Sequence, residues 1–434
     1  MHGQVRHGHG RQWRATAGAG VLLLAAACSD GEGSQPTAAL APVRNDPAEM
    51  QSPAPPAAPA SDPPAAMASP SNAPPENGEG NPPLSNISSP EPTVAPPVSE
   101  PMAPPTAAAA PRFVGRVDTS DAQGARFAWS GTGVVAQFSG SSVAVRLAGG
   151  QQYTVLVDGV LQPKLLATGG SDLLASGLAE GTHSVEIYRR TEADQGEAQF
   201  LGFDFGAGQL LPPPPAPERR IELLGDSISA GYGDEGANMD CHFTPDTENH
   251  YLTYGALAAR ALGAELSTVA WSGKGVVCNY GDDASSCSNP MPTYYDRTLP
   301  ERADSQWRFG DWQPQAVVIN LGTNDFSTAS DPSQQQFEQA YGTLLQHIRA
   351  VYPEALILAT VGPLLSGADL TTARTYIDEV VQARNQAGDA RVKSFELAPT
   401  NAADGYGCDW HPSLRTHQVM ADALIATLRT ELGW

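Results

Sequence analysis

The C-terminal half of the chain repeats one hydrophobic pattern. Short, almost continuously apolar runs alternate with longer segments in which apolar residues recur every three or four positions. The apolar runs predict strands at residues 221–227, 265–271, 315–322, 355–362 and 391–397. The longer segments predict helices at residues 250–264, 332–353, 369–388 and 415–434. Strands that are apolar on both faces and alternate with amphipathic helices indicate a parallel sheet covered by helices on both sides.

Residues 112–208 follow a different pattern. Short runs alternate apolar and polar residues, and turns rich in Gly, Ser and Asp separate them about every ten residues. This pattern predicts an all-β sandwich of the jelly-roll kind, which we interpret as an accessory domain because no catalytic constellation stands out in it. Four consecutive prolines at 212–215 then predict a stiff linker over residues 209–219, before the α/β domain of residues 220–434.

The N-terminal segment predicts export. In this 434-residue chain, Arg11 and Arg14 precede an apolar stretch at residues 15–27 that ends in small residues before Cys28. Residues 1–28 are similar to a bacterial lipoprotein signal with a lipidated cysteine at Cys28, and an ordinary secretory signal is the alternative. Residues 29–111, rich in Pro, Ala and Ser, predict a disordered tether between this anchor and the folded part.

Charge and cysteines narrow the possible partners and ligands. A formal net charge of −22 disfavours nucleic acid and acidic polymers as partners. Four cysteines follow Cys28, and an exported chain permits disulfides, for which we favour the pairs Cys278–Cys287 and Cys241–Cys408. A zinc site is disfavoured because the spacings fit no common zinc module.

Three polar stretches lie at the ends of the first three predicted strands, and a fourth lies between the fifth predicted strand and the last helix. These are Gly225–Ser227, Trp271–Gly275, Gly322–Asp325 and Cys408–Pro412. Since ligands of open parallel sheets bind beyond the carboxyl ends of the strands, we expect these stretches to converge in space.

The converging residues are suited to ester cleavage. Ser227 is the candidate nucleophile and His411 the candidate base, because imidazole titrates near neutral pH. Asn324 and the backbone N–H groups of Ser227 and of a glycine at 273 or 275 are candidate oxyanion donors. Each residue alone also fits a turn, a helix cap or an incidental histidine; only the set in this chain order is specific.

The blocks "GDS", "SGKG", "GTND" and "DWHP" resemble those of the SGNH (GDSL-type) hydrolases over residues 222–434. With a sandwich directly before them, the layout is similar to carbohydrate esterase family 2. The resemblance implies a flavodoxin-like SGNH fold, removal of acetyl groups from xylan and related sugars, Gly273 as the glycine donor, and no metal or cofactor. The α/β-hydrolase motif is absent, because Ser229 stands where it needs glycine.

One departure from the resembled superfamily concerns the histidine's orienting acid. Most SGNH enzymes have an aspartate three residues before the histidine, where this chain has Cys408. The resemblance to family 2 implies a Ser227–His411 dyad with the main-chain carbonyl of Asp409, or of a neighbour, as the orienting acceptor. A triad through the Asp409 side chain is the alternative. Trp271, Tyr280 and Trp410 are candidate sugar-binding residues, with ordinary core packing as the other interpretation.

We therefore expect an exported, monomeric serine esterase that deacetylates plant cell-wall polysaccharide and meets a membrane only through a lipid anchor. The alternatives are another SGNH activity, such as a lipase, a thioesterase or a deacetylase of surface glycans, and a non-catalytic carbohydrate-binding surface protein.

Overall fold

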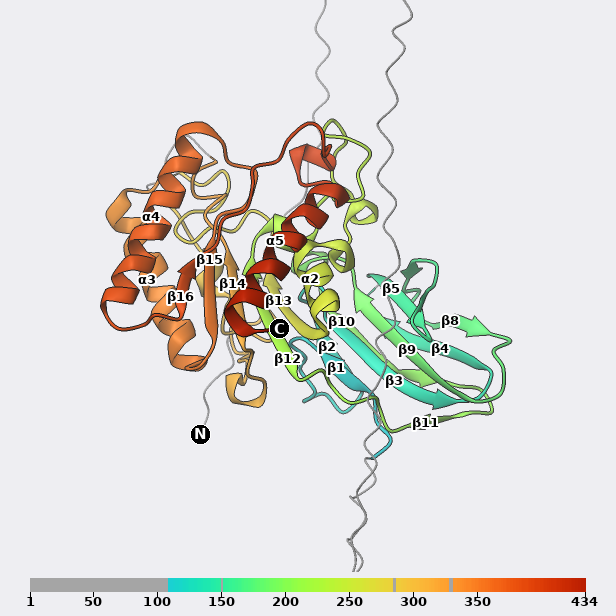
Figure 1. Ribbon diagram of the computed structural model, residues 1–434. Helices are drawn as coiled ribbons and strands as arrows, with labels where there is room; N and C mark the ends of the chain where they lie inside the picture. The colour runs from blue at the N-terminus through green and yellow to red at the C-terminus, as the bar shows by residue number, and fades with distance from the viewer. Residues whose placement is uncertain (1–107, 150, 284–285, 328–330) are drawn as a thin grey trace, which may run out of the picture. The chain divides into compact units, whose positions relative to one another are not determined.

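The computed structural model describes residues 108–149, 151–283, 286–327 and 331–434 (Figure 1). The predicted leader, the lipidation site Cys28 and all but the last four residues of the predicted tether lie outside these residues. The described residues belong to one compact unit.

Eleven strands form the N-terminal domain of the described part. They are β1 Arg112–Val114, β2 Ala125–Phe127, β3 Gly133–Ser139, β4 Ser142–Ala148, β5 Gln152–Val157, β6 Val160–Leu161, β7 Leu165–Leu166, β8 Ser171–Ser176, β9 Thr182–Arg189, β10 Ala198–Asp204 and β11 Gln209–Leu211. One sheet has the order β1-β3-β9-β5-β6, with β11 beside β3 and β7 beside β5, and the other has the order β2-β10-β4-β8. Every pairing is antiparallel, and residues from both sheets, such as Phe127, Phe138 and Val145, share one core. The predicted antiparallel domain is confirmed.

The boundary after this domain differs from the sequence prediction. The predicted linker begins at residue 209, but Gln209–Leu211 pairs with β3 as strand β11. The irregular connection is therefore confined to residues 212–218, before β12 begins at Arg219. Three residues beside a proline run carry too little hydrophobic pattern to reveal a strand that tertiary pairing stabilises.

The second domain is built on five parallel strands. Its elements are β12 Arg219–Gly225, α1 Ser227–Ala230, α2 Tyr254–Leu262, β13 Ala264–Ala270, β14 Ala316–Asn320, α3 Gln334–Val351, β15 Leu356–Thr360, α4 Gly367–Gln386, β16 Val392–Ser394 and α5 Leu414–Leu432, with short 3₁₀ turns that include Cys408–Trp410. The strand order is β13-β12-β14-β15-β16, which is the flavodoxin-like order 2-1-3-4-5. The predicted fold class is confirmed.

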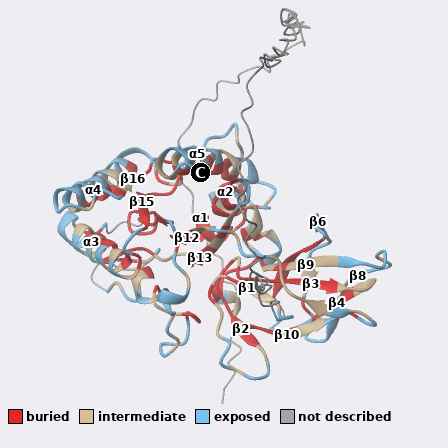
Figure 2. Ribbon diagram, turned by 60° about the horizontal axis from the view of Figure 1, so that its bottom comes forward, coloured by how far each residue is buried: buried red, intermediate tan, exposed pale blue. Residues whose placement is uncertain are grey.

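Both faces of the parallel sheet are buried, which explains why its strands are apolar throughout. Alternate strand residues such as Val317 and Ile357 pack under α3 and α4, whereas Val318 and Leu358 pack under α2 and α5. Figure 2 shows the strands in the colour of buried residues and the outer helix surfaces in that of exposed ones. The predicted helix at 250–264 is shorter, because Thr253 is extended and α2 begins only at Tyr254.

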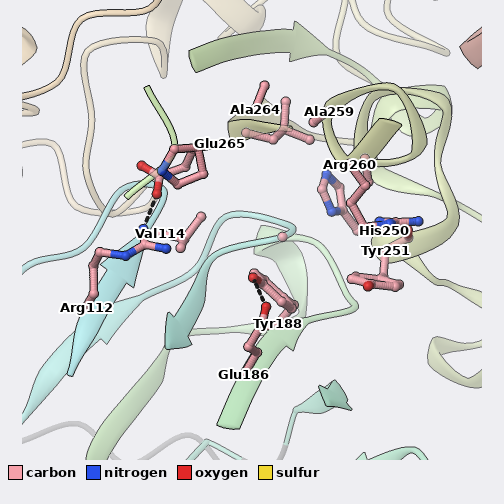
Figure 3. Close-up of a pocket in the computed structure, with 14 residues that line it drawn as sticks. Arg112, Val114, Glu186, Tyr188, His250, Tyr251, Ala259, Arg260, Ala264 and Glu265 are labelled. Atoms are coloured by element: carbon pink, nitrogen blue, oxygen red, sulfur yellow. Dashed lines mark hydrogen bonds and ion pairs between the residues drawn. The ribbon is translucent and has the colours of Figure 1, made fainter. Parts of the chain in front are cut away.

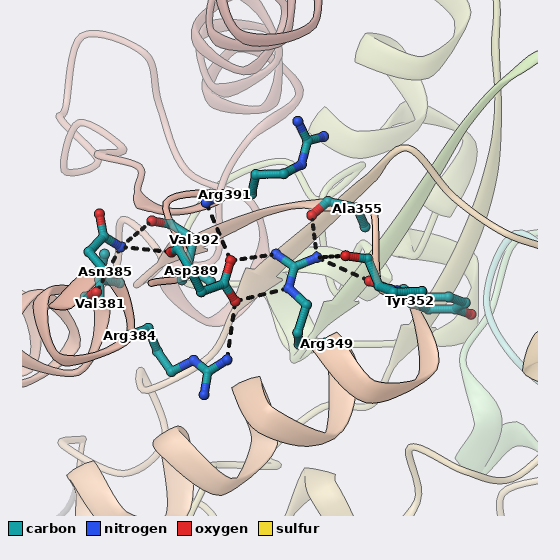
Figure 4. A network of polar contacts seen from close by, with 10 residues as sticks. Arg349, Tyr352, Ala355, Val381, Arg384, Asn385, Asp389, Arg391 and Val392 are labelled. Carbon is teal, nitrogen blue, oxygen red and sulfur yellow. Dashed lines mark hydrogen bonds and ion pairs between the residues drawn. The ribbon is translucent and has the colours of Figure 1, made fainter. Parts of the chain in front are cut away.

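Ion pairs stabilise the end of the parallel sheet at which β15 and β16 begin (Figure 4). Asp389, between α4 and β16, accepts hydrogen bonds from Arg349 at 2.9 Å and from Arg384 at 3.1 Å. Arg349 also donates to the carbonyl of Ala355, just before β15, at 2.7 Å. This network connects the C-terminal ends of α3 and α4 to the start of β15. It lies at the end of the sheet opposite the carboxyl ends of the strands, where the candidate site residues lie.

The two domains share buried polar contacts. The Arg116 guanidinium of the sandwich donates to the Glu222 carboxylate of β12 at 3.1 Å, and both side chains are fully buried. Tyr295 and Tyr352 donate their hydroxyl groups to the same carboxylate at 2.6 Å and 3.0 Å. The sandwich is thus part of the packing around β12, an inner strand of the parallel sheet.

Candidate active site

Strand β12 ends on a turn that presents Ser227. The Asp226 carboxylate accepts a hydrogen bond from the Ile228 N–H at 3.1 Å and so caps the short helix α1, whose first residue is Ser227. The turn requires glycine at position 225, since a Cβ there would lie 2.1 Å from the Ser229 hydroxyl oxygen. The Gly-Asp-Ser sequence therefore builds a sharp strand-to-helix turn at the carboxyl edge of the sheet.

His411 lies against Ser227 although 184 positions separate them in the sequence. The distance from His411 Nε2 to Ser227 Oγ is 2.9 Å, and His411 Nδ1 lies 3.1 Å from the main-chain carbonyl oxygen of Asp409. A carbonyl only accepts hydrogen bonds, so Nδ1 carries the proton and Nε2 is free to accept from the serine hydroxyl.

The Asp409 side chain points elsewhere. It accepts hydrogen bonds from the Phe243 N–H at 2.9 Å, from the Tyr232 hydroxyl at 3.1 Å and from His242 Nδ1 at 2.9 Å. Burial alone would raise the pKa of Asp409, but these three donors hold it below its usual value. Asp409 has a φ of 52°, and this left-handed backbone turns its carbonyl toward the His411 ring.

The surroundings of His411 favour its neutral form. Its ring packs on the Tyr232 ring with centroids 4.2 Å apart, and Tyr232 in turn stacks on Phe243. Burial lowers the pKa of His411 to about 4, because the charged imidazolium loses hydration there. At neutral pH the imidazole is therefore unprotonated and able to act as a base.

The predicted oxyanion donors lie at the same edge of the sheet. The Asn324 amide donates to the Lys274 carbonyl at 2.9 Å and lies 3.3 Å from the Asp226 carboxylate, so it joins the loop after β13 to the serine turn. Gly273 in that loop has a φ of 76°, a conformation that suits glycine. Asp325, next to Asn324, accepts hydrogen bonds from three successive N–H groups and fixes the rest of the loop: Val276, Val277 and Cys278.

Two of the three candidate aromatic residues present exposed rings beside this centre. Trp410, directly before His411, is 58% exposed, and Tyr280 is 67% exposed. The Tyr280 N–H donates to the Gly273 carbonyl at 2.8 Å, which places it next to the predicted oxyanion loop. Trp271 differs, because its ring is half-buried against Trp129 of the sandwich and Tyr294, as in ordinary packing.

Both disulfides link segments of the site. Cys241 is joined to Cys408, the first residue of the turn that carries the carbonyl acceptor and leads into His411, and Cys278 is joined to Cys287. The Asp409 N–H also donates to the Cys241 carbonyl at 2.9 Å. The first disulfide thus holds the histidine turn to the loop that follows α1, and all four cysteines are used in disulfide bonds rather than as thiolate ligands.

Comparison with known proteins identifies the family. Residues 113–215 match the family described as "Carbohydrate esterase 2 N-terminal", and residues 223–419 match the "GDSL-like Lipase/Acylhydrolase family". The chain is 31% identical over 261 residues to an acetylxylan esterase / glucomannan deacetylase of Cellvibrio japonicus, covering 58% of this chain and 68% of that protein. The chain belongs to carbohydrate esterase family 2. It is therefore a carboxylic ester hydrolase.

Other members of family 2 share both domains. The chain is 45% identical over 329 residues to the cellulase/esterase CelE of Acetivibrio thermocellus, which covers 74% of this chain but only 39% of that longer protein. The structure of a family 2 carbohydrate esterase from Clostridium thermocellum in complex with cellohexaose matches with a TM-score of 0.72 at 43% identity. That match covers 75% of this chain and all of the other.

The sequence analysis did not find two residues that lie at or beside the candidate active site. Tyr232 packs on His411 and holds the Asp409 carboxylate, yet "GYGDEG" carries no signal of this contact. Glu192, from the sandwich, contacts Ser272 beside Gly273, and no motif in the sandwich points to it. The role of Asp325 could have been found from the sequence, because Asp325 is the last residue of the Gly-Thr-Asn-Asp block.

The Asp409 geometry yields a prediction. Asp409→Asn retains the carbonyl acceptor, tolerates the left-handed backbone and keeps an acceptor for Phe243, so we expect kcat/KM on an aryl acetate to fall by less than about 10-fold. In a triad, the same substitution at the orienting aspartate costs about 10⁴-fold. A loss of that size in a variant with an unchanged melting temperature would assign the role to the side chain instead.

Proposed function

We propose that this carbohydrate esterase removes O-acetyl groups from plant cell-wall polysaccharide, such as acetylated xylan, with Ser227 and His411 as a catalytic dyad. The observation that carries the proposal is the 2.9 Å contact between Ser227 Oγ and His411 Nε2, with Nδ1 held by a main-chain carbonyl. The names of the Cellvibrio japonicus relatives, acetylxylan esterase / glucomannan deacetylase, support this substrate class.

The geometry supports the following acylation step. Ser227 Oγ attacks the acetyl carbonyl carbon while its proton passes to His411 Nε2. The resulting oxyanion accepts hydrogen bonds from the Ser227 N–H, the Gly273 N–H and the Asn324 amide. The bond to the sugar oxygen then breaks, and His411 returns the proton to that oxygen, which leaves as a free hydroxyl.

Deacylation repeats these steps with water. His411 takes a proton from the water, whose oxygen attacks the acetyl-Ser227 ester, and the second tetrahedral intermediate uses the same donors. Collapse breaks the bond to Ser227 Oγ, which recovers its proton from His411, and acetate is released. The neutral state of His411 at ordinary pH supports its part as the base in both steps.

The two exposed rings support a sugar substrate. Trp410 directly precedes His411 and the Tyr280 N–H donates to the Gly273 carbonyl, so both exposed rings come from segments that carry the proposed site. Sugar rings pack on aromatic faces, and a long polymer reaches such exposed rings more readily than a deep pocket.

Export and a lipid anchor at Cys28 are part of the proposal, and they rest on the sequence. The two disulfides support an oxidising compartment. Within the part of the chain that the structure describes, no helix has the length and apolar character needed to cross a bilayer.

The function is tested with residues 112–434 and acetylated xylan. We expect acetate release from xylan, and hydrolysis of an aryl acetate at least about 10-fold faster than that of the aryl butyrate, since a small acyl site excludes added methylenes. Preference for long acyl esters would indicate a lipase. Binding of polysaccharide without release of acetate from any ester would indicate a non-catalytic carbohydrate-binding protein.

A further inference from the structure

The β-sandwich contributes a carboxyl group to the loop that carries Gly273. Glu192 follows β9 of the sandwich, and its two carboxyl oxygens form hydrogen bonds with the N–H and the hydroxyl of Ser272, each at 2.5 Å. Ser272 directly precedes Gly273, so the peptide unit that bears the Gly273 N–H begins at the residue that Glu192 holds. The contact spans 80 positions of sequence and joins the two domains.

Glu192 is itself rigidly held. The residue is 1% exposed. Its carbonyl accepts from the guanidinium of buried Arg189 at 2.6 Å, and its N–H donates to the carboxyl of buried Glu248 at 3.3 Å. A carboxyl group fixed at both neighbouring peptide units is suited to positioning a loop, because little conformational freedom remains to be lost.

The rest of the Gly273 loop is anchored within the catalytic domain. The Lys274 carbonyl is held by Asn324, and the N–H groups that follow Gly275 are held by Asp325. At the Ser272 end of the loop, the polar side-chain contact is with Glu192 of the sandwich. Trp129 of the sandwich also packs against the Trp271 ring there. Removing Glu192 therefore removes the hydrogen bonds that its side chain makes to Ser272 at this end of the loop.

We propose that Glu192 is a positioning residue for ester hydrolysis: by holding Ser272, the sandwich aims the Gly273 N–H at the developing oxyanion. The proposal rests on the esterase function proposed above. It gives the accessory domain a direct part in the rate of the chemical step, in addition to any part in binding glycan.

The charge state of Glu192 supports this role. Burial, together with nearby Asp194, raises the pKa of Glu192 well above its usual range, and the pKa of Glu248 is raised in the same way. Arg189 opposes this shift, and Tyr232 is a further titratable group in the neighbourhood. The proton is therefore retained at neutral pH and lost as the pH rises. Once ionised, Glu192 would place a negative charge behind the oxyanion hole and disfavour the transition state.

The experiment compares three variants with the wild type by kcat and KM on an aryl acetate. We expect Glu192→Ala to lower kcat by about 10- to 100-fold with KM changed by less than about 2-fold, because the misplaced donor acts on the transition state. Glu192→Gln keeps a neutral acceptor and donor for Ser272, so we expect near-wild-type kcat at neutral pH. The matched control is Glu197→Ala, which breaks an interdomain ion pair with Arg302 away from the loop.

Two further measurements separate positioning from mere packing. Between about pH 6 and about pH 9, the kcat of the wild type should fall with rising pH, whereas that of Glu192→Gln should stay flat. Hydrogen exchange of the peptide that spans residues 271–275 should be faster in Glu192→Ala than in Glu197→Ala. This second measurement requires no esterase activity.

Each outcome decides the proposal. Wild-type kcat and unchanged loop exchange in Glu192→Ala would overturn it, as would an equal loss of kcat in Glu197→Ala. If Glu192→Ala does not fold, parallel pH profiles of the wild type and Glu192→Gln overturn it and divergent profiles support it. If the wild type cleaves no ester, the proposed function fails, and the exchange comparison still shows whether Glu192 holds the loop.

Discussion

Ser227→Ala is expected to lower kcat on acetylated xylan by about 10⁶-fold, the scale seen when the nucleophile of a serine hydrolase is removed. Alanine is compatible with the first position of α1, so the turn and its Asp226 cap should persist. The loss would therefore come from the missing Oγ, which in the structure lies 2.9 Å from His411 Nε2. Initial rates of acetate release, with an enzyme-free blank, measure it.

His411→Ala should give a loss of similar size, and the double variant should be little worse than either single variant. Nucleophile and base act as one unit, so their contributions do not add. Additive losses in the double variant would mean that the two side chains serve separate steps and would contradict the dyad.

A neighbouring serine supplies the control for these variants. Ser229 lies two residues after Ser227, is fully buried and has its hydroxyl 3.0 Å from that of Tyr254. Ser229→Ala should lower the melting temperature, because it leaves Tyr254 with one partner fewer, but it should leave kcat within about 3-fold of the wild type. If Ser229→Ala abolished activity as fully as Ser227→Ala, the effect would belong to the fold of the turn rather than to a nucleophile.

The hydrophobic pattern predicted the parallel sheet and the edge at which the site lies, because each buried strand leaves a long apolar run. It did not predict short edge strands such as β7 and β11, whose two or three residues are stabilised by pairing rather than by pattern.

The candidate residues Ser227, His411 and Asn324 were also predicted, since each follows its strand in a recognisable block. The acceptor of the His411 Nδ1 proton stayed open, because it depends on a left-handed backbone at Asp409 that residue types alone do not specify. The sequence also left open whether Trp271 binds sugar or packs in the core, because its packing against Trp129 depends on contact between the domains. Glu192 and Glu222 had no sequence signal, because the contacts with Ser272 and Arg116 that define them cross between the domains.

Arg116→Ala is expected to lower the free energy of unfolding by about 3–5 kcal/mol, the usual cost of removing one partner from a buried ion pair. The Glu222 carboxylate would then remain fully buried with hydroxyl donors alone, those of Tyr295 and Tyr352. Arg116 also lies 5.1 Å from the centroid of the Tyr295 ring, so packing is lost with the charge. Urea unfolding followed by tryptophan fluorescence measures the change.

Two variants determine whether the buried charge causes this loss. Arg126→Ala removes a partly exposed ion pair with Asp121 inside the sandwich and should cost less than about 1 kcal/mol. Adding Glu222→Gln to Arg116→Ala should restore part of the stability, because a neutral amide can still accept from Tyr295 without an unpaired charge. If the double variant were less stable than Arg116→Ala, the ion pair would not be the source of the effect. Recovery would mean that strand β12 of the catalytic sheet depends for its stability on a side chain of the sandwich.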